Sequence, residues 1–173
     1  METKSTSFLT FMLDGELFAI GVHKVLEIIE TGADHSVTNL PKAPDTIEGV
    51  VNFRGNVIPI VNSRLKFDMA TYGCDDRFVI MVLKLMLNNT EQIVGAMADK
   101  VVDVIEIDEK EIQPVPEVGK GLNSDFITGV LHRNNQFITL LDFEKAISSD
   151  EIIQLKTEDD TIEVEETETA ENL

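Results

Sequence analysis

The sequence predicts a mostly β protein made of two small barrels that pack as a pair related by a pseudo-two-fold axis. Three observations lead to this prediction: apolar runs of strand length alternate with turns, helical signals are weak, and the order of blocks repeats after 76–80 residues. A period this long exceeds that of a solenoid and fits a barrel of about five strands. Since half of the chain buries only a marginal core by itself, we expect the two halves to pack together.

The strand prediction depends on apolar runs that are bounded by turn residues. These runs are Phe8–Leu13, Leu17–Ile20, Val25–Ile29, Ile47–Phe53, Val57–Val61, Arg77–Leu87, Gln92–Ala98, Val101–Ile107, Phe126–His132 and Gln136–Leu141. Asp14–Gly15, between the first two runs, has the permissive backbone of a tight hairpin turn. Pro59 lies within the fifth run, and because proline cannot donate a ladder hydrogen bond, we expect an edge strand or a bulge there.

Short helices are expected at four places between or after these runs. They are Gly21–Lys24, Asn62–Phe67, Glu144–Ile147, and a segment that Ser149 to Glu151 would cap and that continues to about Lys156.

The repeat is the most informative pattern in the chain. Ile47–Val51 reads I-E-G-V-V and Ile127–Leu131 reads I-T-G-V-L, at an offset of 80. Lys24–Ile29 matches Lys100–Ile105 at an offset of 76, and a pair of prolines follows in each half. Apolar strands resemble one another by chance, but the shared order of the blocks favours a duplication.

The charge of the chain excludes several partners. Lys and Arg number 14 against 32 Asp and Glu, a net charge of −18, which works against binding to nucleic acid or to an anionic membrane surface. No apolar run is long enough to span a bilayer. The first residues do not have the pattern of a signal peptide, and a lone Cys74 excludes an internal disulfide framework. We therefore expect a soluble cytoplasmic protein.

The acids are concentrated at the end of the chain. Residues 150–173 hold 10 acids and one lysine, which is half of the net charge. Such a segment buries too little apolar surface to offset its ordering entropy, so we expect a folded domain over 1–157 and a disordered acidic tail over 158–173. The alternative is an acidic peptide that docks on the domain.

The residues contain no persuasive catalytic, metal or cofactor site. His23, His35 and His132 are far apart, and none has a second ligand at metal-binding spacing. Cys74 lies between acidic and turn residues that would raise its pKa, so we interpret it as a loop cysteine. Nucleophile-elbow and phosphate-loop motifs are missing. We therefore expect no catalytic residue, no metal, no cofactor and no enzymatic activity.

Two charged residues next to apolar strands are candidates for partner contact. Arg54 lies at a turn between two apolar runs, where its planar group could pair with a partner's carboxylate or carbonyl. An intramolecular salt bridge is an equally good interpretation from the residues alone. Glu27 lies within an apolar strand, and a stripe of Val25, Glu27 and Ile29 facing outward would form a docking surface.

The chain resembles the chemotaxis coupling proteins of the CheW type over about 8–147. The most specific part is the string from Gly49 to Ile60, which fits G-V-x-N-[LF]-R-G-x-[IV]-x-P-[IV]. Further matching blocks are Phe8–Phe11, Phe18–Ile20, Lys24–Ile28, Leu40–Pro44, Arg64, Phe67, Val94–Gly95, Asp99–Val104, Ile112–Pro116 and Thr128–Val130.

The resemblance implies a fold, an activity and partners. The family fold is two five-stranded, SH3-like β-barrels that share a core. Its members are non-enzymatic adaptors that link the cytoplasmic tips of chemoreceptors to the regulatory domain of the chemotaxis histidine kinase in receptor arrays. By resemblance, the receptor-facing residues would be Val25, Glu27, Gly49, Arg54, Val79 and Val104. Their apolar members would line a groove between the barrels that accepts a helical tip, and barrel ends would contact the kinase.

The sequence departs from the family pattern at a few positions, and other functions stay open. Asn62–Ser63–Arg64 keeps only the arginine of the usual Asp-Leu-Arg, and Ala96–Met97–Ala98 replaces a more apolar stretch. Alternatives are a free-standing copy of the kinase's regulatory domain and a small-ligand barrel, which five strands make too narrow to hold much. An enzyme is the weakest alternative.

Overall fold

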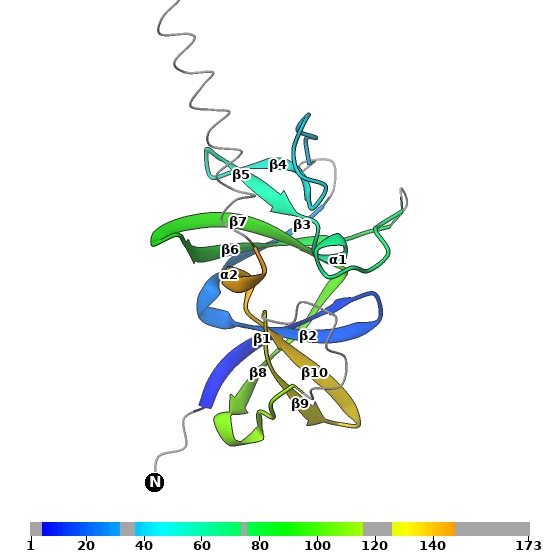
Figure 1. Cartoon of the computed structure of the whole chain (residues 1–173), viewed down its shortest axis with the longest axis vertical. Helices are drawn as coiled ribbons and strands as arrows, with labels where there is room; N and C mark the ends of the chain where they lie inside the picture. The colour runs from blue at the N-terminus through cyan, green and yellow to red at the C-terminus, as the bar shows by residue number, and fades with distance from the viewer. Residues whose placement is uncertain (1–4, 32–36, 74–75, 116–125, 148–173) are drawn as a thin grey trace, which may run out of the picture.

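The computed structural model of the protein describes residues 5–31, 37–73, 76–115 and 126–147, which fold into two curled five-stranded sheets (Figure 1). The order is β8-β1-β2-β10-β9 in one sheet, here the first barrel, and β3-β6-β7-β5-β4 in the other, the second barrel. The predicted mostly β, two-barrel fold is confirmed. The strands are β1 Ser5–Leu13, β2 Glu16–Gly21, β3 Val25–Glu30, β4 Ile47–Phe53, β5 Asn56–Val61, β6 Val79–Leu87, β7 Thr90–Ala98, β8 Lys100–Asp108, β9 Ile127–Arg133 and β10 Gln136–Leu141.

Four short helical segments join the strands. They are η1 Val22–Lys24, α1 Ser63–Lys66, η2 Glu109–Glu111 and α2 Phe143–Ala146. The side chains of Asn62 and Asp142 accept hydrogen bonds from the first turns of α1 and α2 and cap these helices. Three predicted helices are confirmed and η2 was not predicted. The predicted helix that starts near Ser149 and the tail over 158–173 lie outside the described residues.

The sequence repeat and the barrel are different units. The first repeat runs from β1 to β5 and the second from β6 to β10, yet the first barrel combines β1 and β2 with β8, β9 and β10. The second barrel combines β6 and β7 with β3, β4 and β5. The expectation that each repeat forms its own barrel was therefore wrong, because each barrel takes strands from both repeats. The two halves exchange their first hairpins, so neither barrel can close without strands from both repeats.

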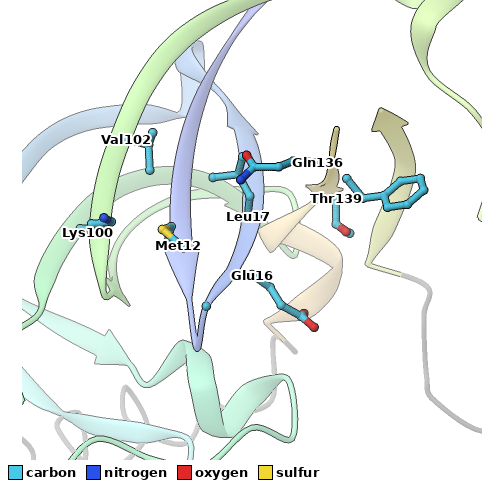
Figure 2. A pocket seen from close by; sticks show the side chains of 9 residues that line it. Met12, Glu16, Leu17, Lys100, Val102, Gln136 and Thr139 are labelled. Carbon is cyan, nitrogen blue, oxygen red and sulfur yellow. The ribbon is translucent and has the colours of Figure 1, made fainter. Parts of the chain in front are cut away.

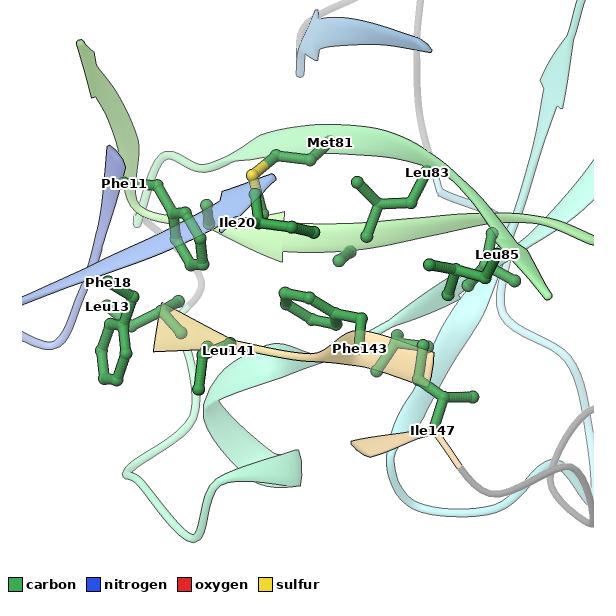
Figure 3. Packing of buried hydrophobic residues seen from close by; sticks show 14 of the residues in the cluster. Phe11, Leu13, Phe18, Ile20, Met81, Leu83, Leu85, Leu141, Phe143 and Ile147 are labelled. Carbon is green, nitrogen blue, oxygen red and sulfur yellow. The ribbon is translucent and has the colours of Figure 1, made fainter. Parts of the chain in front are cut away.

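The central residues of the exchanged hairpins are buried on both faces because they lie between a barrel interior and the core that both barrels share. Figure 3 shows side chains of this shared core. Along β6, Met81, Leu83 and Leu85 enter the shared cluster, while Ile80 and Val82 enter the core of the second barrel. This double burial explains why the run around β6 is continuously apolar instead of alternating. The shared cluster also contains Phe11, Leu13, Phe18, Ile20, Leu141, Phe143 and Ile147.

Pro59 lies in β5, which pairs with β4 on one side and with β7 on the other, so the predicted edge strand is wrong. Val50, opposite Pro59, directs its N–H and C=O to Thr38 on the far side, so the missing N–H of Pro59 does not face β4. The pairing with β7 begins only at Ile60. The predicted bulge lies in the partner strand, between Ile47 and Gly49.

A segment crosses each barrel over the glycine of the I-x-G-V motif. Thr38 exchanges two backbone hydrogen bonds with Val50, and Gln113 does the same with Val130. A Cβ at Gly49 would lie 2.1 Å from the Thr38 carbonyl oxygen, and one at Gly129 would lie 2.4 Å from the Ile112 Cγ2. The repeated glycine therefore makes room for the covering segment.

Candidate functional site

The strongest candidate site is an open hollow at the seam of the second barrel, which we call the seam hollow. It has a volume of about 440 Å³ and is lined by Glu27, Ile28, Ile29 and Glu30 of β3 and by Asn52, Phe53 and Arg54 at the end of β4. β3 and β4 are the two edge strands of their sheet. The hollow therefore lies where the curled sheet is not closed by a ladder of hydrogen bonds.

Arg54 occupies the first position of a two-residue hairpin turn with a left-handed backbone, at φ 50°. Gly55 follows at φ 85°, and its N–H donates to the Asn52 side-chain oxygen at 3.0 Å. The three other two-residue turns have Asp14, Asn88 and Asn134 in the same position. Asp and Asn tolerate this conformation, whereas for other side chains it costs about 1 kcal/mol. An arginine here is therefore explained by its side chain and not by the turn.

The arginine side chain lies over the hollow in contact with two of its walls. Its guanidinium carbon is 4.8 Å from the centre of the Phe53 ring, and Nη2 is 3.9 Å from Oε2 of Glu27. The intramolecular salt bridge that the sequence left open is thus present, but it is long, and the two side chains are 68% and 45% exposed. A pair of this kind contributes less than about 1 kcal/mol, so both charges are accessible to a partner.

The other residues that the resemblance implied lie in several places. Val25 and Val79 are half-buried against the shared core, on the paired strands β3 and β6. Gly49 is buried under Thr38, so any effect it has on a partner passes through the backbone. Val104 is 54% exposed on β8, in the first barrel. The structure brings Glu27 and Arg54 into one hollow and distributes the other four around it or away from it.

The predicted stripe of Val25, Glu27 and Ile29 is wrong. A bulge between Val25 and Glu27 interrupts the alternation of β3, which leaves Leu26 exposed and buries Ile29 in the core of the second barrel. One inserted residue shifts every later side chain of a strand to the opposite face. Glu27 remains exposed at the mouth of the hollow.

Sequence reasoning missed two apolar patches on the outer faces of the barrels. In the first barrel, Met12, Leu17, Val102 and Phe137 line a second open hollow of about 500 Å³, together with Gly15, Glu16, Lys100, Gln136 and Thr139 (Figure 2). Val102 is 49% exposed and Phe137 is 67% exposed. We call this group the first patch.

The repeat relates the first patch to exposed residues of the second barrel. Leu26 and Val57 occupy the positions equivalent to Val102 and Phe137, and they are 40% and 69% exposed. Met86, in the hairpin that the second barrel receives from the second repeat, is 53% exposed. We call these three the second patch. The repeat offset relates Val57 to Phe137 in the sequence, but their exposure follows only from the sheet order.

Among the residues that the structure describes, no group of three histidine, cysteine, aspartate or glutamate side chains could hold a metal ion. The ion pairs Arg54–Glu27, Arg64–Asp99 and Lys24–Glu144 join strands, turns and short helices.

Comparisons with known proteins agree with this geometry. The family model of the CheW-like domain matches residues 7–151. The chain is 36% identical over 151 residues to the chemotaxis protein CheW of Klebsiella aerogenes, with 87% of each chain covered. It is 30% identical to the chemotaxis protein CheW of Treponema pallidum, with 84% of each covered. It also resembles the crystal structure of the scaffolding protein TtCheW from Thermoanaerobacter tengcongensis, with a TM-score of 0.70, 26% identity, and coverage of 84% of this chain and 89% of that one.

Proposed function

The chain belongs to the CheW-like family, and from this membership and its surfaces we infer how it works by binding. It is a non-enzymatic chemotaxis adaptor that couples receptors to the kinase of the pathway. An adaptor of this kind needs one surface for each partner, and the exposed features of the two barrels offer candidates for both.

We propose that the seam hollow receives the cytoplasmic signalling tip of a chemoreceptor. The observation that supports this most strongly is Arg54, an arginine held in a left-handed turn, over Phe53 and beside Glu27. A helical tip would place apolar side chains against Ile28 and Phe53 and polar groups against the two charges. Val25 and Val79 would extend this surface along β3 and β6, and Gly49 would keep the neighbouring backbone in place. Val104 would contact the tip from the first barrel.

We propose that the regulatory domain of the kinase binds at the two patches. Apolar residues that are more than half exposed, such as Val57 and Phe137, are typical of surfaces that a partner covers. Since the patches are equivalent by the repeat, a partner with the same two-barrel fold could use one kind of contact at either end of the adaptor. This divides the surface into a receptor site at the seam and kinase sites on the outer faces.

We also propose that residues 1–157 form the adaptor domain, that 158–173 are an appended acidic tail, and that the protein works in the cytoplasm and reaches receptor arrays through its partners. The family role supports this location, since an adaptor must meet the cytoplasmic ends of receptors. No helix in the described parts of the chain is long and apolar enough to cross a membrane.

Coupling requires more than simultaneous binding. A scaffold transmits a signal only if its contacts have different free energies in the kinase-on and kinase-off assemblies. The long, exposed Arg54–Glu27 pair suits this task, because exchanging it for contacts with the receptor costs little.

Co-sedimentation with a receptor cytoplasmic fragment and the kinase tests the proposal. Arg54→Glu should remove the adaptor from the receptor pellet and leave its association with the kinase. Lys110→Glu, an exposed cation in η2 of the first barrel, makes the same charge change and should keep both. If Arg54→Glu pelleted with the receptor as wild type does, the receptor site would lie elsewhere. Association with neither partner, together with retention of a small molecule, would favour a ligand-binding barrel.

A further inference from the structure

The chain passes from one barrel to the other at two places. After β2 it leaves the first barrel through η1 and enters β3, and after β7 it returns through Asp99 to β8. At both crossovers, a charged side chain pairs with a short helix that follows a strand of the barrel being left, α2 after β10 at the first crossover and α1 after β5 at the second. We call these two pairs the crossover clasps.

The first clasp joins α1 of the second barrel to Asp99. Arg64 donates from Nε and Nη2 to the two Asp99 carboxylate oxygens, at 3.0 and 2.6 Å. The same carboxylate accepts the backbone N–H of Asp14 at 2.8 Å, and the Asp99 N–H donates to the Met12 carbonyl at 2.9 Å. The Arg64 guanidinium also lies 4.2 Å from the centre of the Tyr72 ring. Asp99 is thereby attached to the helix of one barrel and the first hairpin of the other.

The second clasp has the opposite polarity. Glu144 of α2, which follows the first barrel, pairs with the ammonium group of Lys24 at the end of η1. Its other oxygen, Oε2, accepts the backbone N–H of Met86, near the end of β6 in the second barrel, at 3.1 Å. This carboxylate belongs to the helix, whereas that of the first clasp belongs to the crossover, but each carboxylate accepts a backbone hydrogen bond from a hairpin of the barrel that the helix does not follow.

The helix residues of the two clasps are equivalent by the repeat and opposite in charge, and the crossover residues lie one position apart in the repeat. Arg64 and Glu144 are 80 residues apart and are each the second residue of a helix. The paired side chains are 15% and 21% exposed in the first clasp and 29% and 21% in the second. Lys84 and Glu91, an ion pair within the single hairpin β6–β7, are each 52% exposed. The pairs at the crossovers are thus shielded from solvent, unlike the pair inside one barrel.

We propose that Arg64–Asp99 and Lys24–Glu144 are positioning residues that fix the angle between the two barrels, and through it the spacing between the seam hollow and the first patch. The shared core is apolar and attracts without direction, so by itself it permits small rotations. Partly buried ion pairs whose carboxylates also accept backbone hydrogen bonds hold the joined segments at a defined distance and orientation. The coupling part of this inference rests on the proposed function, since the seam hollow and the first patch lie on different barrels.

Spin-label distances in the full-length protein test the clasps. Labels at Thr90→Cys in the second barrel and Glu106→Cys in the first, in a Cys74→Ser background, lie on exposed strand positions. Arg64→Gln and Lys24→Gln, singly and together, should broaden or shift the inter-label distance distribution while the circular dichroism spectrum stays that of a folded protein. Lys84→Gln is the matched control and should leave the distribution unchanged. A distribution of wild-type mean and width in both single variants would overturn the proposal.

A coupling assay separates this inference from the proposed function. In assemblies of receptor fragment, kinase and adaptor, the double variant should lower kinase stimulation about fivefold or more, while the affinities for each partner alone remain close to wild type. Full stimulation by the double variant would refute the coupling part of the inference. Failure of the wild-type protein to bind either partner would refute the proposed function, and the distance measurement on the free protein would still decide whether the clasps set the angle.

Discussion

The guanidinium of Arg54 lies 3.9 Å from the carboxylate of Glu27, across the seam between the two edge strands of the second barrel. Glu27 lies on β3 and Arg54 lies in the turn between β4 and β5, and the two residues meet only because the sheet curls. The pair is exposed, and Arg54 holds a left-handed backbone conformation that its counterparts fill with Asp or Asn. Local stability therefore does not explain the arginine, and the function of its side chain should be separable from the fold.

Arg54→Asn should remove the function of the arginine side chain and leave the fold intact. Asparagine suits the left-handed turn, as Asn134 does at the equivalent position. The free energy of unfolding should equal that of the wild type or exceed it by up to about 1 kcal/mol, because the strain of the arginine is removed and only an exposed cation–π contact and a long, exposed ion pair are lost. Affinity for a receptor fragment should fall at least tenfold, which corresponds to about 1.4 kcal/mol. Urea unfolding and a binding isotherm measure the two effects. Destabilisation together with unchanged binding would contradict this account of Arg54.

The two motif glycines should respond differently to alanine. At Gly49 the new Cβ would meet a backbone carbonyl at 2.1 Å, so the Thr38 segment and its two hydrogen bonds would have to move. At Gly129 the nearest atom is a methyl group of the Ile112 side chain, which can rotate. We expect Gly49→Ala to lower the unfolding free energy by about 3 kcal/mol and Gly129→Ala by about 1 kcal/mol.

Thermal unfolding of both glycine variants checks this order. Gly73→Ala is a suitable reference, because its Cβ would lie 3.4 Å from the flexible Asp76 carboxylate. Equal losses at Gly49 and Gly129 would argue against the covering segment at Thr38 as the reason for the glycine.

Acid should remove the contribution that the Arg64–Asp99 ion pair makes to the free energy of unfolding. Burial by itself would raise the pKa of the Asp99 carboxyl, but hydrogen bonds from Arg64 and the Asp14 N–H outweigh burial and hold this pKa below its ordinary value. The stabilisation is therefore present above the ordinary pKa of the unfolded chain and is lost as the pH falls through the lower pKa of the folded state. The difference in unfolding free energy between wild type and Asp99→Asn should be constant from about pH 5 to 7 and shrink below about pH 4. Denaturant unfolding at several pH values measures it, and a difference that grows toward acid would have the wrong sign.

The two barrels should unfold as one unit. Phe143 is 1% exposed in the cluster that contains strands of both barrels, and each barrel needs strands of both repeats to close. Phe143→Ala should cost about 3–5 kcal/mol and lower a single transition. Leu131→Ala, in the separate core of the first barrel, should lower the same single transition. Two resolved calorimetric transitions in either variant would show that the barrels unfold independently.

Much of the fold could be predicted from local pattern, and its connectivity could not. The runs that became β4 and β10 were predicted with their exact or nearly exact bounds, because their alternation and turn residues are local signals. The exchange of hairpins leaves no trace in any local window, since both β1 and β6 form ordinary hairpins with the following strand. The internal position of Pro59 likewise depends on where Val50 directs its hydrogen bonds, which is a tertiary property.

The candidate site could be predicted only in part, because it also depends on tertiary structure. Arg54 and Glu27 were identified as unusual charges beside apolar strands, and the structure places both at one hollow. The outward stripe through Ile29 failed because the bulge after Val25 cannot be read from residue types alone. Val57 and Phe137 were assigned to strands without regard to face, so their exposure became apparent only from the sheet order.

Amide chemical-shift mapping with a receptor cytoplasmic fragment tests the central claim most directly. Titrating the fragment into isotope-labelled protein should shift the amides of Glu27, Ile28, Phe53 and Arg54 most, while Val102 and Phe137 on the first patch stay unchanged. In Arg54→Glu, the same titration should produce no shifts at the seam hollow, whereas Lys110→Glu should reproduce the wild-type pattern. Shifts that concentrate on the first patch and leave the seam hollow unaffected would contradict the account.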